Sequence, residues 1–253
     1  MTLFLVGGGP SASLSDVHDA FAASVRAQAR GRAAKLAFIS AGLPDEVEAL
    51  VSMYTAPLLE RLPDCEIIEI YLLPTVAGED EGAEPVDPTV WPESLDDLDG
   101  VIVAGGHTPS YLTGLTPKRN ELARLVRADV PYLGYSAGAS VTSRHALVGG
   151  WKVNGRAVGA QAWSEGLDEV SVVDGLAMIT PTIGTHADVS LNDGLLISLV
   201  EQDRARTCVA VDEDTCLVVD PITGRTAHYG QGRIRWFSRE ATDVAVTTQY
   251  PAS

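Results

Sequence analysis

The sequence is poor in cysteines, in basic residues and in long apolar runs, and each shortage excludes a class of protein. Its three cysteines, Cys65, Cys208 and Cys216, include no C-x-x-C pair. An odd number of widely spaced cysteines does not form a disulfide framework, and no cysteine zinc site is expected. Lysines and arginines number 18 against 34 acidic residues, for a net charge of -16. That balance opposes binding to nucleic acid or to an anionic membrane through a broad basic surface.

No window of the chain approaches the roughly 20 apolar residues of a membrane span. The amino-terminal stretch "MTLFLVGGG" does not begin with basic residues and contains too few consecutive apolar residues for a signal peptide. We therefore expect a cytoplasmic protein with neither nucleic acid nor membrane as a partner. A homodimer is compatible with the sequence, which carries no signal of oligomeric state.

Strands and helices alternate through the first half of the chain. Five short apolar runs are typical of buried strands: "LFLVGGG", "KLAFIS", "CEIIEIYLL", "GVIVAGG" and "PYLGY". Helices are predicted over 13–31, 43–62 and 116–129, the second with a kink or a split at Pro57. This alternation predicts a parallel sheet covered on both faces. The acidic segment 74–99, rich in proline and glycine, is typical of a surface loop.

The second half of the chain has a different pattern. A strand is predicted over 175–184 and a helix over 191–202, followed by short strands separated by turn residues. These strands read as an antiparallel addition to the same domain. We expect one domain over residues 1–253.

Gly134-Tyr135-Ser136-Ala137-Gly138 fits the pattern G-x-S-x-G, between a buried strand and a run of small, helix-compatible residues. A serine hydroxyl is a weak nucleophile and must be presented to a base and a substrate together. A sharp strand-to-helix turn does this, and glycines flank the serine where side chains would clash. The alternative is a small-residue turn that only packs a helix on the sheet. The helix start also aims the amide of Ala137 at any negative oxygen nearby.

A nucleophilic serine needs a base, and the chain has five histidines. His18 and His145 are expected on helices, as surface or packing residues, and His228 lies in the late hairpin region. His107 and His186 each follow a predicted strand. Functional groups gather at the carboxyl ends of parallel strands, which favours these two.

Several acids are candidates for orienting that base. Asp212, Glu213 and Asp214 lie where one predicted strand ends and the next begins, although acids at such junctions are most often turn formers. Asp188 and Asp193 follow His186 closely and are further candidates.

Two glycine-rich loops complete the set. In "VIVAGGHTPSYL" a glycine pair at a strand end lets a backbone amide face a cavity, so Gly106 is a candidate oxyanion donor together with Ala137. The loop "VGGGPSA" fits the dinucleotide pattern G-x-G-x-x-A. We reject that interpretation because Pro10 occupies the loop and the second strand ends in "AFIS", without an acid for a ribose. No cofactor and no metal are expected.

Taken in order, "LVGGG", "VAGGHTPSYL", "GYSAGAS" and "THADVSLNDGLLISLV" followed by "VAVDEDT" resemble the S51 serine peptidases, the group of dipeptidase E and cyanophycinase. The resemblance runs from the first strand to about Val219. It implies a three-layer α/β/α fold related to class I glutamine amidotransferases, with a mostly parallel central sheet. It also implies hydrolysis of a small peptide or isopeptide.

The resemblance implies a Ser–His–Glu triad that falls on Ser136, His186 and Glu213. The amides of Gly106 and Ala137 would then form the oxyanion hole. Asp188 could replace Glu213 as the orienting acid, by analogy with the amidotransferases. The candidate substrate-binding residues are His107, Thr108, Asp188 and Asn192.

Two departures from the family pattern concern the substrate. His107 follows the glycine pair where the family usually has Asn or Asp. Cyanophycinases carry arginines shortly after the histidine, whereas here none occurs before Arg204. Specificity for an aspartyl or β-aspartyl peptide is therefore in doubt.

Two rival interpretations remain. In an α/β-hydrolase esterase the order would be Ser136, then Asp212 or Asp214, then His228, but no HGGG-type oxyanion motif is present. The chain could instead bind a small ligand or partner without catalysis, with Ser136 a relic of the turn.

Overall fold

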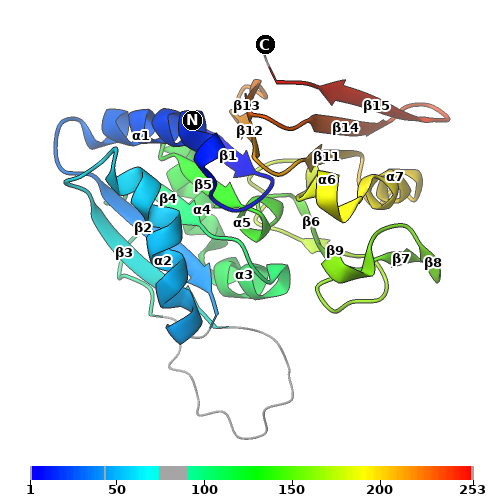
Figure 1. Ribbon diagram of the computed structural model, residues 1–253, viewed down its shortest axis with the longest axis horizontal. Helices are drawn as coiled ribbons and strands as arrows, with labels where there is room; N and C mark the ends of the chain where they lie inside the picture. The colour runs from blue at the N-terminus through cyan, green and yellow to red at the C-terminus, as the bar shows by residue number, and fades with distance from the viewer. Residues whose placement is uncertain (1, 43, 74–89, 252–253) are drawn as a thin grey trace, which may run out of the picture.

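The structure is a computed structural model that describes residues 2–42, 44–73 and 90–251 (Figure 1). Most of the surface loop predicted over 74–99 lies outside the described residues.

A seven-stranded sheet occupies the centre, in the order β13-β12-β1-β5-β4-β2-β3. Neighbouring strands among β1, β5, β4, β2 and β3 pair in parallel, and β12 and β13 extend the β1 side with antiparallel pairs. The predicted mostly parallel sheet with antiparallel late strands is confirmed. The bounds are β1 (Leu3–Val6), β2 (Lys35–Ala41), β3 (Glu66–Leu72), β4 (Gly100–Val103), β5 (Tyr132–Tyr135), β12 (Thr215–Val219) and β13 (Thr226–Gly230).

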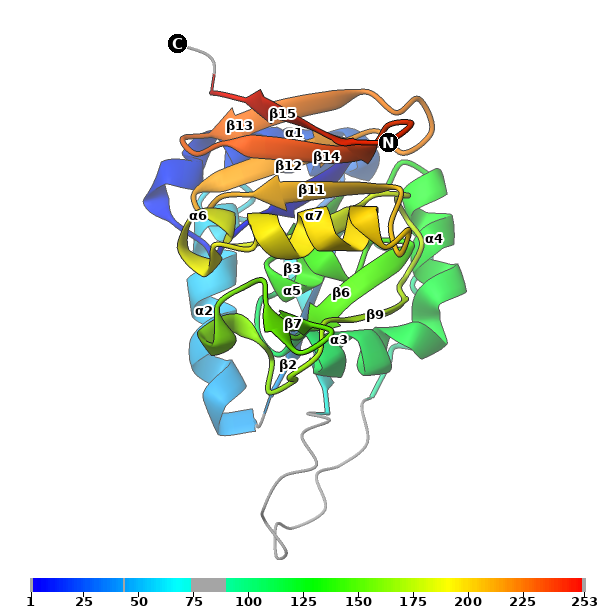
Figure 2. The ribbon, with the colours of Figure 1, turned by 90° about the vertical axis from the view of Figure 1, so that its right-hand side faces the viewer.

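Helices cover both faces of this sheet, which gives three layers (Figures 1 and 2). On one face lie α1 (Ser15–Ala29) and α2 (Pro44–Leu59), and on the other lie α3 (Thr108–Leu115) and α4 (Arg119–Arg127). The inner parallel strands β1, β5, β4 and β2 are buried because both faces are covered, which explains their apolar sequences, whereas the edge strands β3 and β13 are partly exposed. Of the predicted kink or split at Pro57, the split is wrong, because α2 runs past that residue to Leu59.

The four-stranded second sheet has the order β10-β11-β14-β15. Its strands are β10 (Thr182–Gly184), β11 (Thr207–Val211), β14 (Ile234–Arg239) and β15 (Val244–Gln249). Helix α7 (Asp193–Glu201) packs on it through Leu196 and Leu199, which share a small core with Cys208 and Phe237. β11 and β12 follow each other in sequence but belong to different sheets, so the acidic turn between them crosses from one sheet to the other.

The segment after Ser136 differs from the sequence prediction. The helix that begins there, α5 (Ala137–Ser140), is only four residues long. His145 is therefore not helical: it is the first residue of strand β6 (His145–Gly149), which pairs with β9 (Ser171–Asp174). A small hairpin, β7 (Lys152–Val153) with β8 (Arg156–Ala157), and a short helix, α6 (Ala187–Ser190), complete this region. Sequence analysis also missed α3.

Three strands of the central sheet end at one edge. β1, β5 and β4 are adjacent and parallel, so the loops after them meet at their carboxyl ends. Those loops begin with Gly7, with Ser136 and with Ala104, which precedes the glycine pair at 105–106. This edge collects the candidate residues.

Within the described ranges, no helix combines the length and the apolar character that crossing a bilayer requires. Nor do the described residues contain a group of three or more His, Cys, Asp or Glu side chains arranged to hold a metal ion.

His18 is a buried, titratable group beneath the sheet edge. It lies on α1 and is 2% exposed, and its Nε2 is 2.8 Å from the hydroxyl of Tyr135. Burial, aided by the positive charge of Arg61, lowers the pKa of His18 to about 4, and the carboxylates of Asp16 and Asp19 oppose this only partly. His18 is thus a neutral packing residue at physiological pH.

We expect the free energy of unfolding to fall as the pH drops from about 6.5 to about 4. In that window the unfolded chain binds a proton at His18 that the folded chain does not, so acid favours unfolding. His18→Gln, which keeps a partner for Tyr135 but does not titrate, should flatten the fall by on the order of 2 kcal/mol. Urea unfolding between pH 7.5 and 4.5 measures this. His145→Gln is the control, because that imidazole is exposed; equal slopes in the two variants would contradict the assignment to His18.

Candidate active site

Ser136 lies in a strained turn between β5 and α5. Its backbone has φ 48 and ψ -109, a conformation that side-chain-bearing residues rarely adopt. The glycines on either side make the turn sterically feasible. A Cβ on Gly134 would lie 2.5 Å from the carbonyl oxygen of Gly138, and a Cβ on Gly138 would lie 2.4 Å from that of Val103. The Ser136 amide donates to the Val6 carbonyl at 3.0 Å, which anchors the turn to β1.

A continuous chain of hydrogen bonds starts at this serine. Oγ of Ser136 is 2.7 Å from Nε2 of His186, and Nδ1 of His186 is 2.8 Å from Oε1 of Glu213. An ionised carboxylate only accepts, so Nδ1–H donates to Glu213 and leaves Nε2 of a neutral imidazole to accept from the serine hydroxyl. The arrangement can draw a proton from Ser136 and balance the resulting charge.

His186 is held by the first glycine loop and by an aromatic ring. Its backbone is left-handed, with φ 52, and its amide donates to the Gly7 carbonyl at 2.7 Å. A Cβ on Gly7 would lie 2.1 Å from the Asp212 carbonyl oxygen, so only glycine fits there. Trp163 stacks on the imidazole with ring centroids 4.6 Å apart. The "VGGG" loop thus supports the histidine, which accounts for Gly7 without a dinucleotide.

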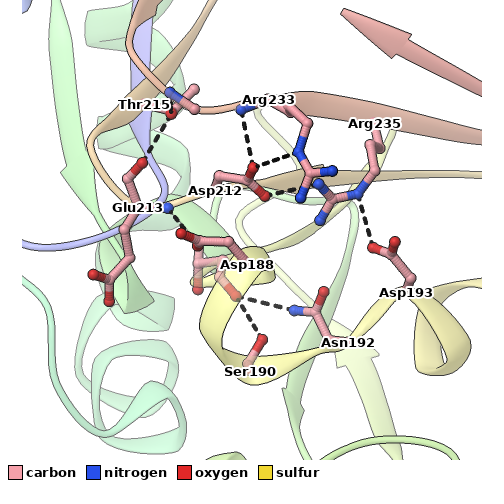
Figure 3. A network of polar contacts seen from close by, with 11 residues as sticks. Asp188, Ser190, Asn192, Asp193, Asp212, Glu213, Thr215, Arg233 and Arg235 are labelled. Atoms are coloured by element: carbon pink, nitrogen blue, oxygen red, sulfur yellow. Dashed lines mark hydrogen bonds and ion pairs between the residues drawn. The ribbon is translucent and has the colours of Figure 1, made fainter. Parts of the chain in front are cut away.

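Glu213 is held where the chain crosses from β11 to β12 (Figure 3). Just before it, the buried Asp212 carboxylate accepts hydrogen bonds from Arg233 and Arg235. The Glu213 amide donates to Oδ1 of Asp188 at 2.8 Å. Figure 3 shows the Glu213 side chain pointing away from both arginines. The ion pairs therefore fix the backbone and leave the Glu213 carboxylate to His186.

Two buried tyrosines fix the peptide before Gly106. The Gly105 amide donates to the Tyr54 hydroxyl at 3.1 Å, and the Tyr111 hydroxyl donates to the Gly105 carbonyl at 3.0 Å. Burial raises the pKa of both tyrosines, so both hydroxyls are protonated at neutral pH. Gly106 follows with φ 147, a left-handed conformation that favours glycine. Among the described residues, neither its amide nor that of Ala137 has a protein acceptor.

A pocket of about 240 Å³ opens beside the serine and histidine. This volume is below the range typical of drug-sized ligands, about 300–1,000 Å³, and suits a small molecule. The residues that line it are Gly106, Thr108, Ser136, Ser140, Leu147, Gly149, Gly150, Gly159, Ala160, Trp163, Glu165, Gly184, Thr185, His186, Ser190, Asn192 and Leu195.

Of the candidate substrate-binding residues, Thr108 and Asn192 line this pocket, whereas His107 and Asp188 do not. Nδ1 of His107 is 2.8 Å from the Ser110 hydroxyl. Asp188 supports the Glu213 amide rather than bonding to His186.

The remaining candidate bases and acids lie in other surroundings. Both ring nitrogens of His228 are buried without a partner within the described part of the chain, and the residue pairs with Leu217 in the central sheet. Asp193 forms an ion pair with Arg235. The geometry thus offers Ser136 no contact with the histidine that the esterase interpretation requires.

Sequence analysis missed one wall of the pocket. Trp163 and Glu165 come from the stretch 149–166, for which no element was predicted. The only signal was composition: five glycines lie within these eighteen residues, together with two tryptophans. Such a density of glycine without apolar periodicity is typical of loops around a site.

Comparison with known proteins adds two findings. Peptidase E of Streptomyces coelicolor is 33% identical over 112 residues, which make up 44% of this chain and 39% of that protein. The match thus spans less than half the length of this relative. A crystal structure of a peptidase from an acI-B1 actinobacterium has the same fold, with a TM-score of 0.63 over 98% of this chain and 96% of that one. At 14% identity this second likeness shows the fold alone.

Over the matched 112 residues the chain is similar to peptidase E. The resemblance predicted from the ordered motifs is thereby confirmed. No family model matches the sequence.

Glu213→Gln should slow the reaction of Ser136 with a fluorophosphonate by about 10³- to 10⁴-fold, since a neutral amide cannot balance an imidazolium. Asp188→Ala should slow it by less than about tenfold, because water can replace the acceptor of an exposed amide. Gel-based labelling rates measure both. A larger loss in Asp188→Ala than in Glu213→Gln would mean that Asp188, not Glu213, orients His186.

Proposed function

We propose that the protein is a serine peptidase that hydrolyses a small peptide or isopeptide through an acyl-enzyme on Ser136. One observation carries the proposal: an uninterrupted chain of hydrogen bonds joins Ser136, His186 and Glu213 at the wall of a small pocket. The likeness to peptidase E supports peptide bonds as the target.

In the first step His186 takes the hydroxyl proton as Ser136 Oγ attacks the carbonyl carbon of the substrate. The carbonyl oxygen becomes negative in the tetrahedral intermediate. The amides of Gly106 and Ala137 stabilise it as oxyanion donors. His186 then gives its proton to the leaving amine, and the C–N bond breaks.

In the second step water replaces the amine. His186 accepts a proton from the water, which attacks the acyl-enzyme, and returns that proton to Ser136 as the acid leaves. Throughout, Glu213 holds the imidazole in the reactive tautomer and balances its positive charge. Trp163 shields one face of the ring, which limits its freedom to rotate away from Ser136.

The dimensions of the pocket restrict the substrate. A volume of about 240 Å³ accommodates one or two residues rather than an extended chain. A dipeptide or a short isopeptide is therefore the expected class.

A library of dipeptides and isoaspartyl peptides tests this proposal. We expect wild type to release amino acids from some members and Ser136→Ala to be slower by about 10⁵-fold or more, because the nucleophile is absent. Released amines are quantified by mass spectrometry, so no chromogenic group is required.

Histidine variants provide matched controls. His186→Ala should abolish fluorophosphonate labelling of Ser136, whereas His228→Ala should retain it, since His228 lies in the central sheet. Loss of labelling only in His228→Ala would instead favour the esterase triad. A folded wild type that is neither labelled nor active would favour a non-catalytic binding protein.

A further inference from the structure

We propose that the substrate carries a positively charged nitrogen group, an ammonium or guanidinium, that binds to Glu165 in the pocket beside Ser136. This inference rests on the proposed function, since it names the substrate class of the same site. It assigns Glu165 as a specificity-determining residue.

The Glu165 carboxylate is positioned but not neutralised. Its Oε1 accepts a hydrogen bond from the hydroxyl of the buried Thr108 at 3.0 Å, which joins the pocket wall to the start of α3. Among the described residues, no lysine, arginine or histidine forms an ion pair with Glu165, and Oε2 has no donor. A partly buried carboxylate with a free oxygen favours a cationic ligand.

The rest of the pocket supplies no positive charge to compete for that ligand. Neither lysine nor arginine is among the residues that line it, and Glu165 is the carboxylate among them. The whole chain is also strongly acidic, with a net charge of -16. A substrate bearing only carboxylates would be repelled by Glu165 without a compensating partner, whereas a cation would be attracted.

The backbone at this position gives glutamate no structural advantage. Glu165 has φ 52, followed by Gly166 at φ 76, so both residues are left-handed. That conformation costs a residue other than glycine roughly 1–2 kcal/mol. The turn is nonetheless held tightly: the Gly150 amide donates to the Ser164 carbonyl at 2.8 Å, and a Cβ on Gly149 would lie 2.8 Å from that of Glu165. These contacts fix the turn that carries the Glu165 side chain into the pocket wall.

Asn192 lines the same pocket and has one acceptor atom without a partner. The residue is 8% exposed, and its Nδ2 donates to the Thr185 carbonyl at 3.0 Å. That bond fixes the amide orientation and leaves Oδ1 buried without a partner in the described structure. A buried acceptor without a partner at the pocket wall favours a ligand that carries N–H donors, as ammonium and guanidinium groups do.

The cation could be the free amino terminus of the substrate or a basic side chain, and phosphonate probes separate these sources. Diphenyl phosphonates react at the proposed nucleophile. Ser136 Oγ forms a bond to phosphorus as a P–O bond to phenolate breaks, and His186 transfers the serine proton to the departing phenolate, which leaves as phenol. The first pair is Gly-Ala phosphonate with a free or an acetylated amino terminus. The second pair is acetyl-lysyl and acetyl-norleucyl phosphonate. Second-order labelling rates are measured at pH 7.

Glu165→Gln removes the charge and retains an acceptor for Thr108. The matched control is Asp174→Asn, which loses the same charge from a side chain that is 84% exposed and outside the pocket. In wild type and control we expect the cationic member of at least one pair to react faster. In Glu165→Gln its rate should fall by about 10- to 100-fold, with the neutral members changed by less than about threefold.

The outcomes distinguish the two proposals. Wild type without cation preference in either pair, or preference retained in Glu165→Gln, would overturn the assignment to Glu165 while the serine mechanism stands. Preference in the first pair alone identifies the amino terminus as the cation, and preference in the second pair alone identifies a side chain. Failure of every probe to label Ser136 in folded wild type would overturn the proposed function itself.

Discussion

The strained conformation of Ser136 is the constraint on which the site depends. A residue at φ 48 and ψ -109 is unfavourable in isolation, and here it is imposed by the close approach of two glycine backbones. Any side chain at 134 or 138 would collide with a carbonyl group, so the turn and the packing of α5 against the sheet require each other. The Ser136 amide bonds to the Val6 carbonyl at the end of β1, and the next residue, Gly7, accepts the hydrogen bond from the His186 amide. The turn at Ser136 is therefore fixed relative to the loop that binds His186. The short distance between Ser136 and His186 is therefore a consequence of main-chain packing rather than of side-chain flexibility.

Glu213, the third member of the hydrogen-bonded chain, is positioned by electrostatic interactions instead. Glu213 lies in a crossing between two sheets, where neither strand alone would fix its position. Asp212 and Arg235 form an ion pair whose side chains are almost fully buried. Such pairs contribute little net stability, but breaking one leaves a buried charge uncompensated. Because a loop conformation that breaks the Asp212–Arg235 pair is strongly disfavoured, the pair specifies one conformation of this crossing. In that conformation the neighbouring Glu213 carboxylate bonds to His186 and not to an arginine.

The sequence predicted the parts of this molecule that follow from local pattern. Five apolar runs predicted the parallel strands, because both faces of such a sheet are buried. The placement of Ser136 and His186 at strand ends brought them to one edge. Local pattern did not predict that β11 and β12 would separate into two sheets, since a strand–turn–strand sequence is also typical of a hairpin. It also mistook the run after Ser136 for a longer helix, because small residues suit a helix as well as the buried turn found here. The pocket wall around Trp163 is shaped by glycine backbones and was unpredictable from periodicity.

The electrostatics of the site fit the absence of arginine after His186. A pocket built for a carboxylate-bearing substrate needs a cation, and the walls described here supply none. They supply instead a carboxylate held by Thr108 and a buried amide oxygen at Asn192. Glu213 does not line the pocket, whereas Glu165 does, so the two carboxylates have different proposed purposes. In the proposed reaction Glu213 would balance the charge formed on His186, and Glu165 would meet a charge that arrives with the substrate. The two proposed roles are compatible because they involve different contacts: Glu213 bonds to Nδ1 of His186, whereas Glu165 lies two residues after Trp163, which stacks on that ring.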